Sequence, residues 1–188
     1  MNDGALYKYL INESQKGVHK WAHFLAIYEK HLSRFRGKPV VLLEIGVDSG
    51  GSLTMWKNFL GPDSQVIGLD INPLCKELEE EGVEIFIGSQ KDPTVIDLIF
   101  SKYPKIDILI DDGSHQINDI KSSFDLIYKR LQLDGIYIIE DVQAIYDKTI
   151  AKVNASSQFM EFINQAVTEL NAGYLGGIPS TRFTCTTD

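Results

Sequence analysis

The stretch Val41-Leu42-Leu43-Glu44 is an apolar run that ends in a carboxylate, and three later stretches repeat this pattern. They are Val66-Ile67-Gly68-Leu69-Asp70, Ile108-Leu109-Ile110-Asp111-Asp112 and Ile136-Tyr137-Ile138-Ile139-Glu140-Asp141. Short continuous apolar runs are typical of strands that are buried on both faces, as in a parallel sheet. Because ligands bind at the carboxyl ends of the strands in open α/β sheets, the acids predict a functional edge.

Helical patterns lie between these runs, the clearest over residues 116–131. Strands are expected over 40–45, 65–71, 83–87, 106–111 and 136–140, and helices over 4–15, 20–35, 52–60, 73–81, from Pro93, over 116–131 and over 156–170. This alternation predicts an α/β fold, a Rossmann-like doubly wound and mostly parallel sheet. We expect one domain, 1–188, with a helical lead-in (1–37), an α/β core (38–170) and a tail (171–188).

Composition narrows the possible partners. The 188 residues suit one domain with a sizeable core. A net charge of −8 without a basic cluster argues against nucleic acid or an anionic membrane as a partner. The two cysteines are far apart and favour a reducing compartment. No signal peptide and no run of membrane-spanning length is evident, so a cytoplasmic location is expected.

A glycine-rich loop follows the first predicted strand, with the spacing G-x-x-x-G-G from Gly46 to Gly51. It is either an ordinary turn or a loop whose backbone approaches a ligand closely. The acid that precedes it, Glu44, would repel a pyrophosphate but would suit a cationic or zwitterionic ligand. Asp70 ends the second strand, where an acid is either solvated or accepts hydrogen bonds from the ribose hydroxyls of a nucleoside. The two features together favour a nucleoside cofactor.

Gly88-Ser89-Gln90 ends the third strand, where small polar side chains either touch an adenine edge or simply form a turn.

Two acidic pairs, Asp111-Asp112 and Glu140-Asp141, end the fourth and fifth strands. Adjacent strands are about 4.8 Å apart, so these acids would repel one another unless a cation neutralises them. Mg²⁺ prefers such oxygen ligands. The alternative is that one acid caps a helix and the others are solvated.

His115 is either a general base for a substrate hydroxyl or a cap of the following helix.

These motifs resemble one family. The pattern L-L-E-I-G-V-x-x-G-G-S-L-x-M-W, followed by G-L-D-I, G-S-Q-x-D, I-D-D-G-S-H and I-I-E-D, is similar to the class I S-adenosylmethionine-dependent methyltransferases. It most resembles the metal-dependent sugar O-methyltransferases of the macrocin and mycinamicin type and their cephalosporin hydroxylase-like relatives. The similarity covers about residues 18–146 and includes the lead-in His19-Lys20-Trp21.

The resemblance implies roles for individual residues. The implied cofactor-binding residues are Glu44, Gly46, Gly50, Ser52, Asp70, Ser89 and Gln90. Of these, Glu44, Gly46 and Ser52 would lie along the methionine part of S-adenosylmethionine, Asp70 would hold the ribose, and Ser89 and Gln90 would flank the adenine. Asp112, Glu140 and Asp141 match the ligands of Mg²⁺, and His115 matches the catalytic base.

The implied activity is transfer of a methyl group from S-adenosylmethionine to a hydroxyl of a sugar or glycosylated natural product. The alternatives are a non-catalytic or truncated S-adenosylmethionine-binding module and a hydroxylase-like oxygenase. The family's fold normally closes with a C-terminal strand hairpin, and this chain is expected to lack part of it, with at most one strand in 180–187. The tail, through residues 182–186, or a second subunit is expected to cover the open edge of the fifth strand, which predicts a sheet of five or six strands and a homo-oligomer, most simply a dimer.

Overall fold

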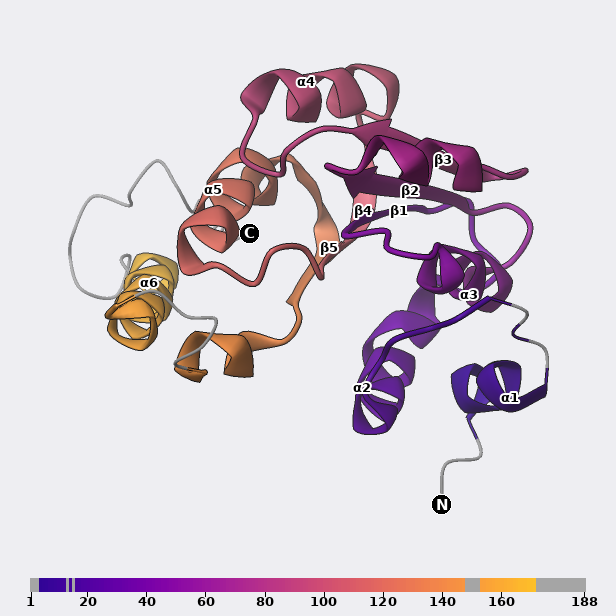
Figure 1. Cartoon of the computed structure of the whole chain (residues 1–188), viewed down its shortest axis with the longest axis horizontal. Helices are drawn as coiled ribbons and strands as arrows, with labels where there is room; N and C mark the ends of the chain where they lie inside the picture. Colours follow the sequence, from indigo (N-terminus) through magenta and orange to yellow (C-terminus); the bar gives the residue numbers. More distant parts are fainter. Residues whose placement is uncertain (1–3, 13, 15, 148–152, 172–188) are drawn as a thin grey trace.

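A five-stranded parallel sheet forms the centre of the molecule. The computed structural model describes residues 4–12, 14, 16–147 and 153–171. The strands are β1 (Val41–Ile45), β2 (Gln65–Asp70), β3 (Val83–Ile87), β4 (Ile106–Asp111) and β5 (Leu131–Ile139), in the order β3-β2-β1-β4-β5 (Figure 1). The predicted doubly wound α/β fold is confirmed. The strand order reverses between β1 and β4, which is where such sheets bind ligands.

Helices cover both faces of this sheet because neighbouring strand residues point in opposite directions. Leu42 packs with α1 (Ala5–Asn12), α2 (Ala22–Leu32) and α3 (Gly51–Leu60). Leu43 packs on the other face with α4 (Pro93–Lys102) and α5 (Ile117–Ile127). The last helix, α6 (Ala155–Leu170), packs against α5 and β5 on that second face (Figure 1).

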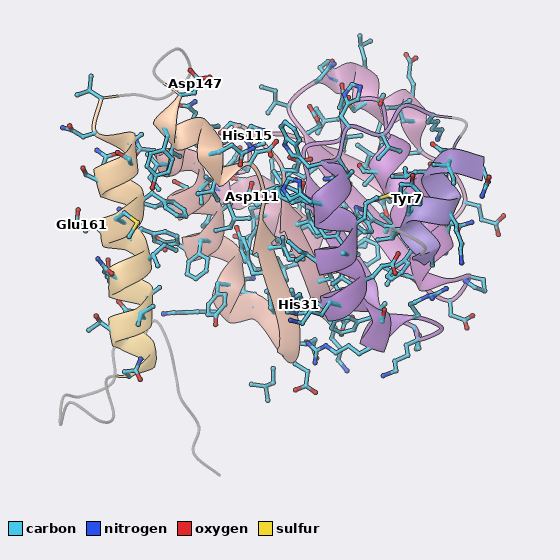
Figure 2. The ribbon with its side chains drawn as sticks, turned by 90° about the horizontal axis from the view of Figure 1, so that it is seen from below. Tyr7, His31, Asp111, His115, Asp147 and Glu161 are labelled. Atoms are coloured by element: carbon cyan, nitrogen blue, oxygen red, sulfur yellow. The ribbon has the colours of Figure 1, made fainter. Side chains whose placement is uncertain are left out.

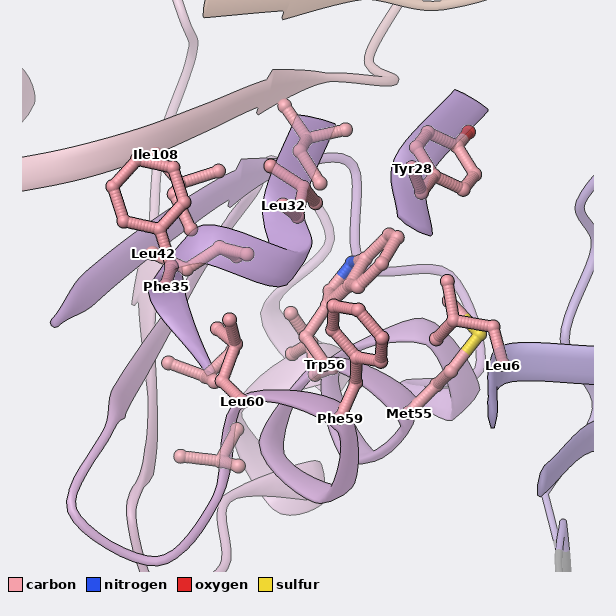
Figure 3. Close-up of a cluster of buried hydrophobic side chains, with 14 of the residues drawn as sticks. Leu6, Tyr28, Leu32, Phe35, Leu42, Met55, Trp56, Phe59, Leu60 and Ile108 are labelled. Atoms are coloured by element: carbon pink, nitrogen blue, oxygen red, sulfur yellow. The ribbon is translucent and has the colours of Figure 1, made fainter. Parts of the chain in front are cut away.

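The core on the α1–α3 face reaches up to the functional edge. Tyr28 of α2 and Trp56 of α3 are fully buried, with ring centroids 5.0 Å apart in an edge-to-face arrangement. The Tyr28 hydroxyl points away from Trp56 (Figure 3). This aromatic pair gives the carboxyl ends of the central strands a rigid apolar support.

Two predicted elements differ from the structure. The helix expected over 73–81 is a 3₁₀-helix, Pro73–Leu78, because Glu79 leaves the helical conformation and its carboxylate accepts a hydrogen bond from Ile85 N of β3 (2.8 Å). The fifth strand begins at Leu131 instead of residue 136. Leu131 pairs with Ile106 and Ile136 with Ile108, so the residues between them, 132–135, form a bulge inside this strand.

The outer edge of β5 is the edge at which a further strand or a second chain could pair with the sheet. Within the described ranges, β5 pairs with β4 alone. The possible strand over 180–187 lies outside the described residues. In the part of the chain that the structure describes, no helix has the length and apolar character needed to cross a membrane.

Candidate functional site

The loops after β1, β4 and β5 leave the sheet side by side. Asp112 N donates to Ile45 O, and Glu140 N donates to Asp111 O, both at 2.9 Å. These bonds continue the strand register one residue past the sheet. The acids that the sequence places at separate strand ends are therefore brought to one edge.

The glycine loop after β1 needs glycine for steric reasons. Gly46 has φ +92°, and a Cβ on it would lie 2.1 Å from the backbone oxygen of Asp112. Gly50 has φ +75° and precedes the first residue of α3. A Cβ on Gly51 would lie 1.9 Å from Gly17 O. The predicted close approach therefore occurs between segments of the protein itself, and the loop is fixed against both neighbours.

Two cavities open along this edge. The first, of about 350 Å³, is lined by the β1–α3 loop, including Gly46 and Ser52, and by Asp112. The second, of about 410 Å³, is lined by Ser89 and Gln90 after β3, among others. Asp70 lines both cavities, as do Gly46 and Gly113. An elongated ligand could therefore occupy both cavities with its middle part beside Asp70, and the volumes suit small-molecule sites.

Asp70 is held in place at this junction by backbone amides. Its Oδ2 accepts a hydrogen bond from Val47 N and its Oδ1 from Asn72 N, both at 2.8 Å. Oδ2 also accepts a longer hydrogen bond from Asp48 N (3.4 Å), so the remaining acceptor capacity is mainly at Oδ1. The side chain is thus oriented by the protein and can still accept hydrogen bonds from a ligand.

Two of the predicted cofactor residues have partners inside the protein. Glu44 is fully buried, and its Oε2 accepts a hydrogen bond from Ser52 Oγ (2.7 Å), which lines the first cavity. The Gln90 amide donates to Asp111 (3.1 Å) and its Oε1 accepts from Ser114 N (3.2 Å), so Gln90 also supports the loop after β4. Their roles toward a cofactor stay predictions.

Three carboxylates surround one ammonium at the end of the first cavity. We call Glu44, Asp112 and Glu140 the inner acid set. Lys20 Nζ lies 3.0 Å from Glu44 Oε1, 2.7 Å from Asp112 Oδ2 and 2.9 Å from Glu140 Oε1. The lysine side chain is 2% exposed. The inner acid set is thus neutralised in part by the chain itself.

The electrostatics of this set follow from burial and close charges. Burial lowers the pKa of Lys20, but Glu44, Glu140 and Asp112 raise it by more, so the amine stays charged. Burial raises the pKa of Glu140 to about 7, with Lys20 opposing and Asp112 adding to the rise. Burial and then the charge of Glu140 raise the pKa of Tyr28, whose buried hydroxyl has no hydrogen-bond partner among the described residues.

The sequence did not identify Lys20 as a site residue. Lys20 was named only as part of the lead-in that resembles the family, and it lay in a helix that was expected to begin at residue 20. In the structure α2 begins at Ala22 because the residues before it extend along the strand ends. No spacing rule connects a lysine before the first strand with acids at three strand ends.

A second group, the outer acid set, consists of Asp112, His115 and Asp141. One ligand atom from each lies within 4.8 Å of the others. His115 Nε2 is 4.0 Å from both Asp112 Oδ1 and Asp141 Oδ2. Figure 2 labels His115, in the loop that follows β4. Carboxylate oxygens and an imidazole nitrogen form a donor set that fits a divalent cation.

The backbone of the outer acid set is in an unusual conformation. His115 has φ +54° and Asp141 has φ +48°, a region that costs free energy for residues other than glycine and often occurs at functional sites. Asp141 is further held by Trp21, whose Nε1–H donates to Oδ1 (3.0 Å). His115 lies one residue before Gln116, the cap position of α5. The geometry therefore does not favour the alternative in which His115 only caps α5.

The structure distributes the predicted metal ligands between the two sets. Asp112 belongs to both, Glu140 to the inner set and Asp141 to the outer set. Asp111 is separate, because it faces the buried hydroxyls of Ser123 (2.6 Å) and Tyr137 (3.2 Å). Burial raises its pKa, and the hydrogen bonds oppose this rise. The complete set Asp112, Glu140 and Asp141 stays a prediction.

Comparisons with known proteins show what the chain as a whole is similar to. No family model matches the chain. Demethylmacrocin O-methyltransferase of Streptomyces fradiae is 34% identical over 137 residues, which are 68% of this chain and 34% of that protein. Mycinamicin VI 2''-O-methyltransferase of Micromonospora griseorubida is 36% identical over 130 residues, or 65% of this chain and 32% of that protein. The chain thus spans about a third of the length of the curated relatives it matches.

A solved structure extends the similarity to most of the chain. The MycE methyltransferase of the mycinamycin biosynthetic pathway, in complex with Mg, SAH and mycinamycin VI, superimposes with a TM-score of 0.78 and 28% identity. The match covers 94% of this chain and 47% of that one. The chain therefore has the class I S-adenosylmethionine-dependent methyltransferase fold and is related to the macrocin- and mycinamicin-type sugar O-methyltransferases.

Proposed function

We propose that this domain transfers a methyl group from S-adenosylmethionine to a hydroxyl of a sugar or glycosylated natural product, with Mg²⁺ as a second cofactor. One observation carries the proposal. Asp112 lines the first cavity and also belongs to the outer acid set. A methyl donor in the cavity and an acceptor hydroxyl at the outer acids would therefore meet at this residue.

The two cavities would accommodate the parts of the methyl donor in order. Asp70 at the junction would accept hydrogen bonds from the ribose hydroxyls, and Ser89 and Gln90 would flank the adenine in the second cavity. The methionine part would lie along Gly46, Gly50 and Ser52, with the carboxylate of Glu44 behind Ser52. A cavity bordered by acids suits a sulfonium cation and an ammonium group.

Asp112, Glu140 and Asp141 are the residues that would hold Mg²⁺. A bound divalent cation supplies Lewis-acid chemistry, which orients a hydroxyl and lowers its pKa. His115 Nε2, 4.0 Å from two of these acids, is placed to accept the hydroxyl proton. The acceptor oxygen would then form its bond to the methyl carbon while the sulfur–carbon bond breaks and S-adenosylhomocysteine leaves. In this proposal the domain would hold donor, cation and base together.

Two measurements test this function. Calorimetry with S-adenosylhomocysteine should show binding by the chain, and Asp70→Ala should weaken it by about 10- to 100-fold for each lost charge-assisted hydrogen bond. Methyl transfer from labelled S-adenosylmethionine to macrolide glycosides and rhamnosides should require Mg²⁺ and stop in excess chelator.

The alternatives predict other results. Cofactor binding without transfer to any acceptor would indicate a binding module instead of an enzyme, in keeping with the third of the relatives' length that the chain spans. Absence of cofactor binding would contradict the proposal altogether. A hydroxylase-like iron site usually needs two histidines and a carboxylate, whereas the outer acid set offers one histidine among the described residues.

Assembly and location belong to the same proposal. Leu133 at the outer edge of β5 is 99% exposed, and an exposed strand edge is open to pairing with a second chain. We therefore expect a homo-oligomer, and light scattering at micromolar concentration should give at least twice the monomer mass. A monomer would contradict this part of the proposal.

A cytoplasmic location is proposed because the two cysteines are far apart in the sequence and are expected to be free thiols.

A further inference from the structure

A short segment before α2 lies along the functional edge. Residues 17–21 contact the ends of three strands, β1, β4 and β5, or the loops that follow them. Gly17 O accepts a hydrogen bond from Ser49 Oγ (2.9 Å), and His19 Nδ1 lies 3.3 Å from Asp48 Oδ2. Lys20 then enters the inner acid set, and Trp21 donates to Asp141. This segment therefore brings a cation to acids that the sheet has already assembled.

Lys20 is the central contact of this segment. An ammonium has three N–H donors, and Lys20 has one carboxylate within hydrogen-bond distance for each of them. Its Nζ also lies 6.0 Å from the centre of the Trp56 ring, which is fully buried. The amine therefore has a fixed position with an apolar support below it and carboxylates around it.

The oxygens that Lys20 engages are specific ones. They are Oδ2 of Asp112 and Oε1 of Glu140, so the other oxygen of each carboxylate is not used by the amine. Asp112 Oδ1 is on the side of His115 and the outer acid set. Groups that hydrogen-bond to metal ligands orient those ligands and affect metal affinity.

We propose that Lys20 is a positioning residue of the methyl-transfer site, whose ammonium occupies the inner of two cation positions and directs the free oxygen of Asp112 to the outer one. This inference rests on the proposed function, since the outer position is where the divalent cation would act. Removing the amine should leave an inner position formed by three carboxylate oxygens within 4.8 Å of one another, which is a size that a divalent cation fits.

Binding of Mn²⁺, followed by electron paramagnetic resonance, gives a readout other than activity. The wild-type chain should bind one Mn²⁺ ion. Lys20→Met should bind two, and its melting temperature should rise much more with Mn²⁺ than that of the wild type, because the ion replaces the lost ammonium. Lys102→Met is the matched control, since it removes a lysine that pairs with Glu84 at the surface. The control should bind one ion with unchanged affinity.

Lys20→Arg keeps the charge and provides a second test if Lys20→Met fails to fold in both chelator and Mn²⁺. A planar guanidinium cannot reproduce three bonds that converge on one nitrogen, so the orientation of the acids changes. We expect one bound Mn²⁺ ion with about 10- to 100-fold weaker affinity.

The outcomes separate this inference from the proposed function. Suppose that Lys20→Met binds a single Mn²⁺ ion and that Mn²⁺ raises its melting temperature no more than that of the wild type. This result would refute the inner cation position. Lys20→Arg with wild-type affinity would refute the positioning role. A wild-type chain that binds no Mn²⁺ would instead contradict the proposed function, and a Mn²⁺ ion bound by Lys20→Met alone would still support the inner position.

Discussion

The inner and outer acid sets stand at the same sheet edge and share Asp112, yet they differ in almost every physical respect. The inner acids Glu44 and Glu140 are at most 3% exposed, whereas His115 and Asp141 of the outer set are 27% and 28% exposed. The inner set surrounds a lysine of the chain itself. No lysine or arginine among the described residues forms an ion pair with Asp141.

The difference shows how one strand edge can serve two purposes. The sheet places acids at the ends of β1, β4 and β5, and repulsion between them must be offset. In the inner set a buried ammonium does this permanently. In the outer set His115 and Asp141 are partly exposed and have positive φ, which keeps their side chains available to a ligand.

The largest expected effect concerns the base of the outer set. His115→Ala should lower the rate of methyl transfer by roughly 10²- to 10⁴-fold, because the hydroxyl proton loses its acceptor. Single-turnover transfer with saturating S-adenosylmethionine measures this rate, and cofactor affinity should stay the same. His31→Ala on α2 is the control. A small rate loss that does not vary with pH would reduce His115 to a structural residue.

The inner set should make stability depend on pH. Burial raises the pKa of Glu140 from an ordinary 4.5 to about 7, so between these values the folded chain keeps a proton that the unfolded chain releases. Its contribution to the free energy of unfolding therefore falls as pH rises, by at most roughly 3 kcal/mol. Urea denaturation of wild type and Glu140→Gln in chelator, from pH 4.5 to pH 7.5, should show this difference.

Glu84 offers a control with the opposite sign. Burial raises its pKa, but hydrogen bonds from Lys102 and Tyr103 lower it by more, and the net shift is downward. Its contribution to stability is present above the ordinary carboxyl pKa and is lost as pH falls through the lowered value. Glu84→Gln should therefore cost stability at neutral pH and little in acid. If the free energies of unfolding of Glu140→Gln and Glu84→Gln, each relative to wild type, changed with pH in the same direction, the contrast between the two sites would be contradicted.

Asp141 should matter for the cation and little for folding. Asp141→Asn removes one charged oxygen ligand of the outer set and should weaken Mn²⁺ binding by at least about tenfold. Calorimetric titration measures this affinity. Asp134→Asn, at an exposed position of the β5 bulge, should leave it unchanged. Equal affinity in Asp141→Asn and wild type would place the cation elsewhere.

The smallest effect is expected at Trp21. Trp21→Phe keeps an aromatic ring and removes only the Nε1–H that donates to Asp141 at 3.0 Å. Because Trp21 is 56% exposed, water can replace this donor. Mn²⁺ affinity should fall by less than about tenfold, and the same titration measures it. A loss as large as that of Asp141→Asn would mean that Trp21 does more than orient the carboxylate.

The sequence predicted the sheet well because each strand is a local signal. The apolar runs and the helical spacing over 116–131 follow from burial that each segment shows by itself. It also predicted that the acids at the ends of β4 and β5 would meet, since strand ends of a parallel sheet share one edge. The strand pattern alone could not separate Asp111 from Asp112, and only the family resemblance did, because it depends on the rotation of the folded strand which of the two side chains faces Ser123 and which faces the cavity.

Lys20 could not be predicted because its position is a tertiary property. Its partners lie 24 to 120 residues away along the chain. The bulge of β5 was missed for a related reason. Leu131 belongs to the helical pattern before it, and only pairing with Ile106 makes it a strand residue.

The central claim is that the donor cavity and the outer acid set meet at Asp112. Nuclear magnetic resonance of S-adenosylmethionine with a ¹³C-labelled methyl group tests this directly, with Mn²⁺ as a paramagnetic probe. Mn²⁺ should strongly increase the relaxation rate of the methyl carbon in the wild type, and Asp141→Asn should reduce this effect at equal Mn²⁺ concentration. Tight binding of both ligands with no effect of Mn²⁺ on the methyl carbon would contradict the account.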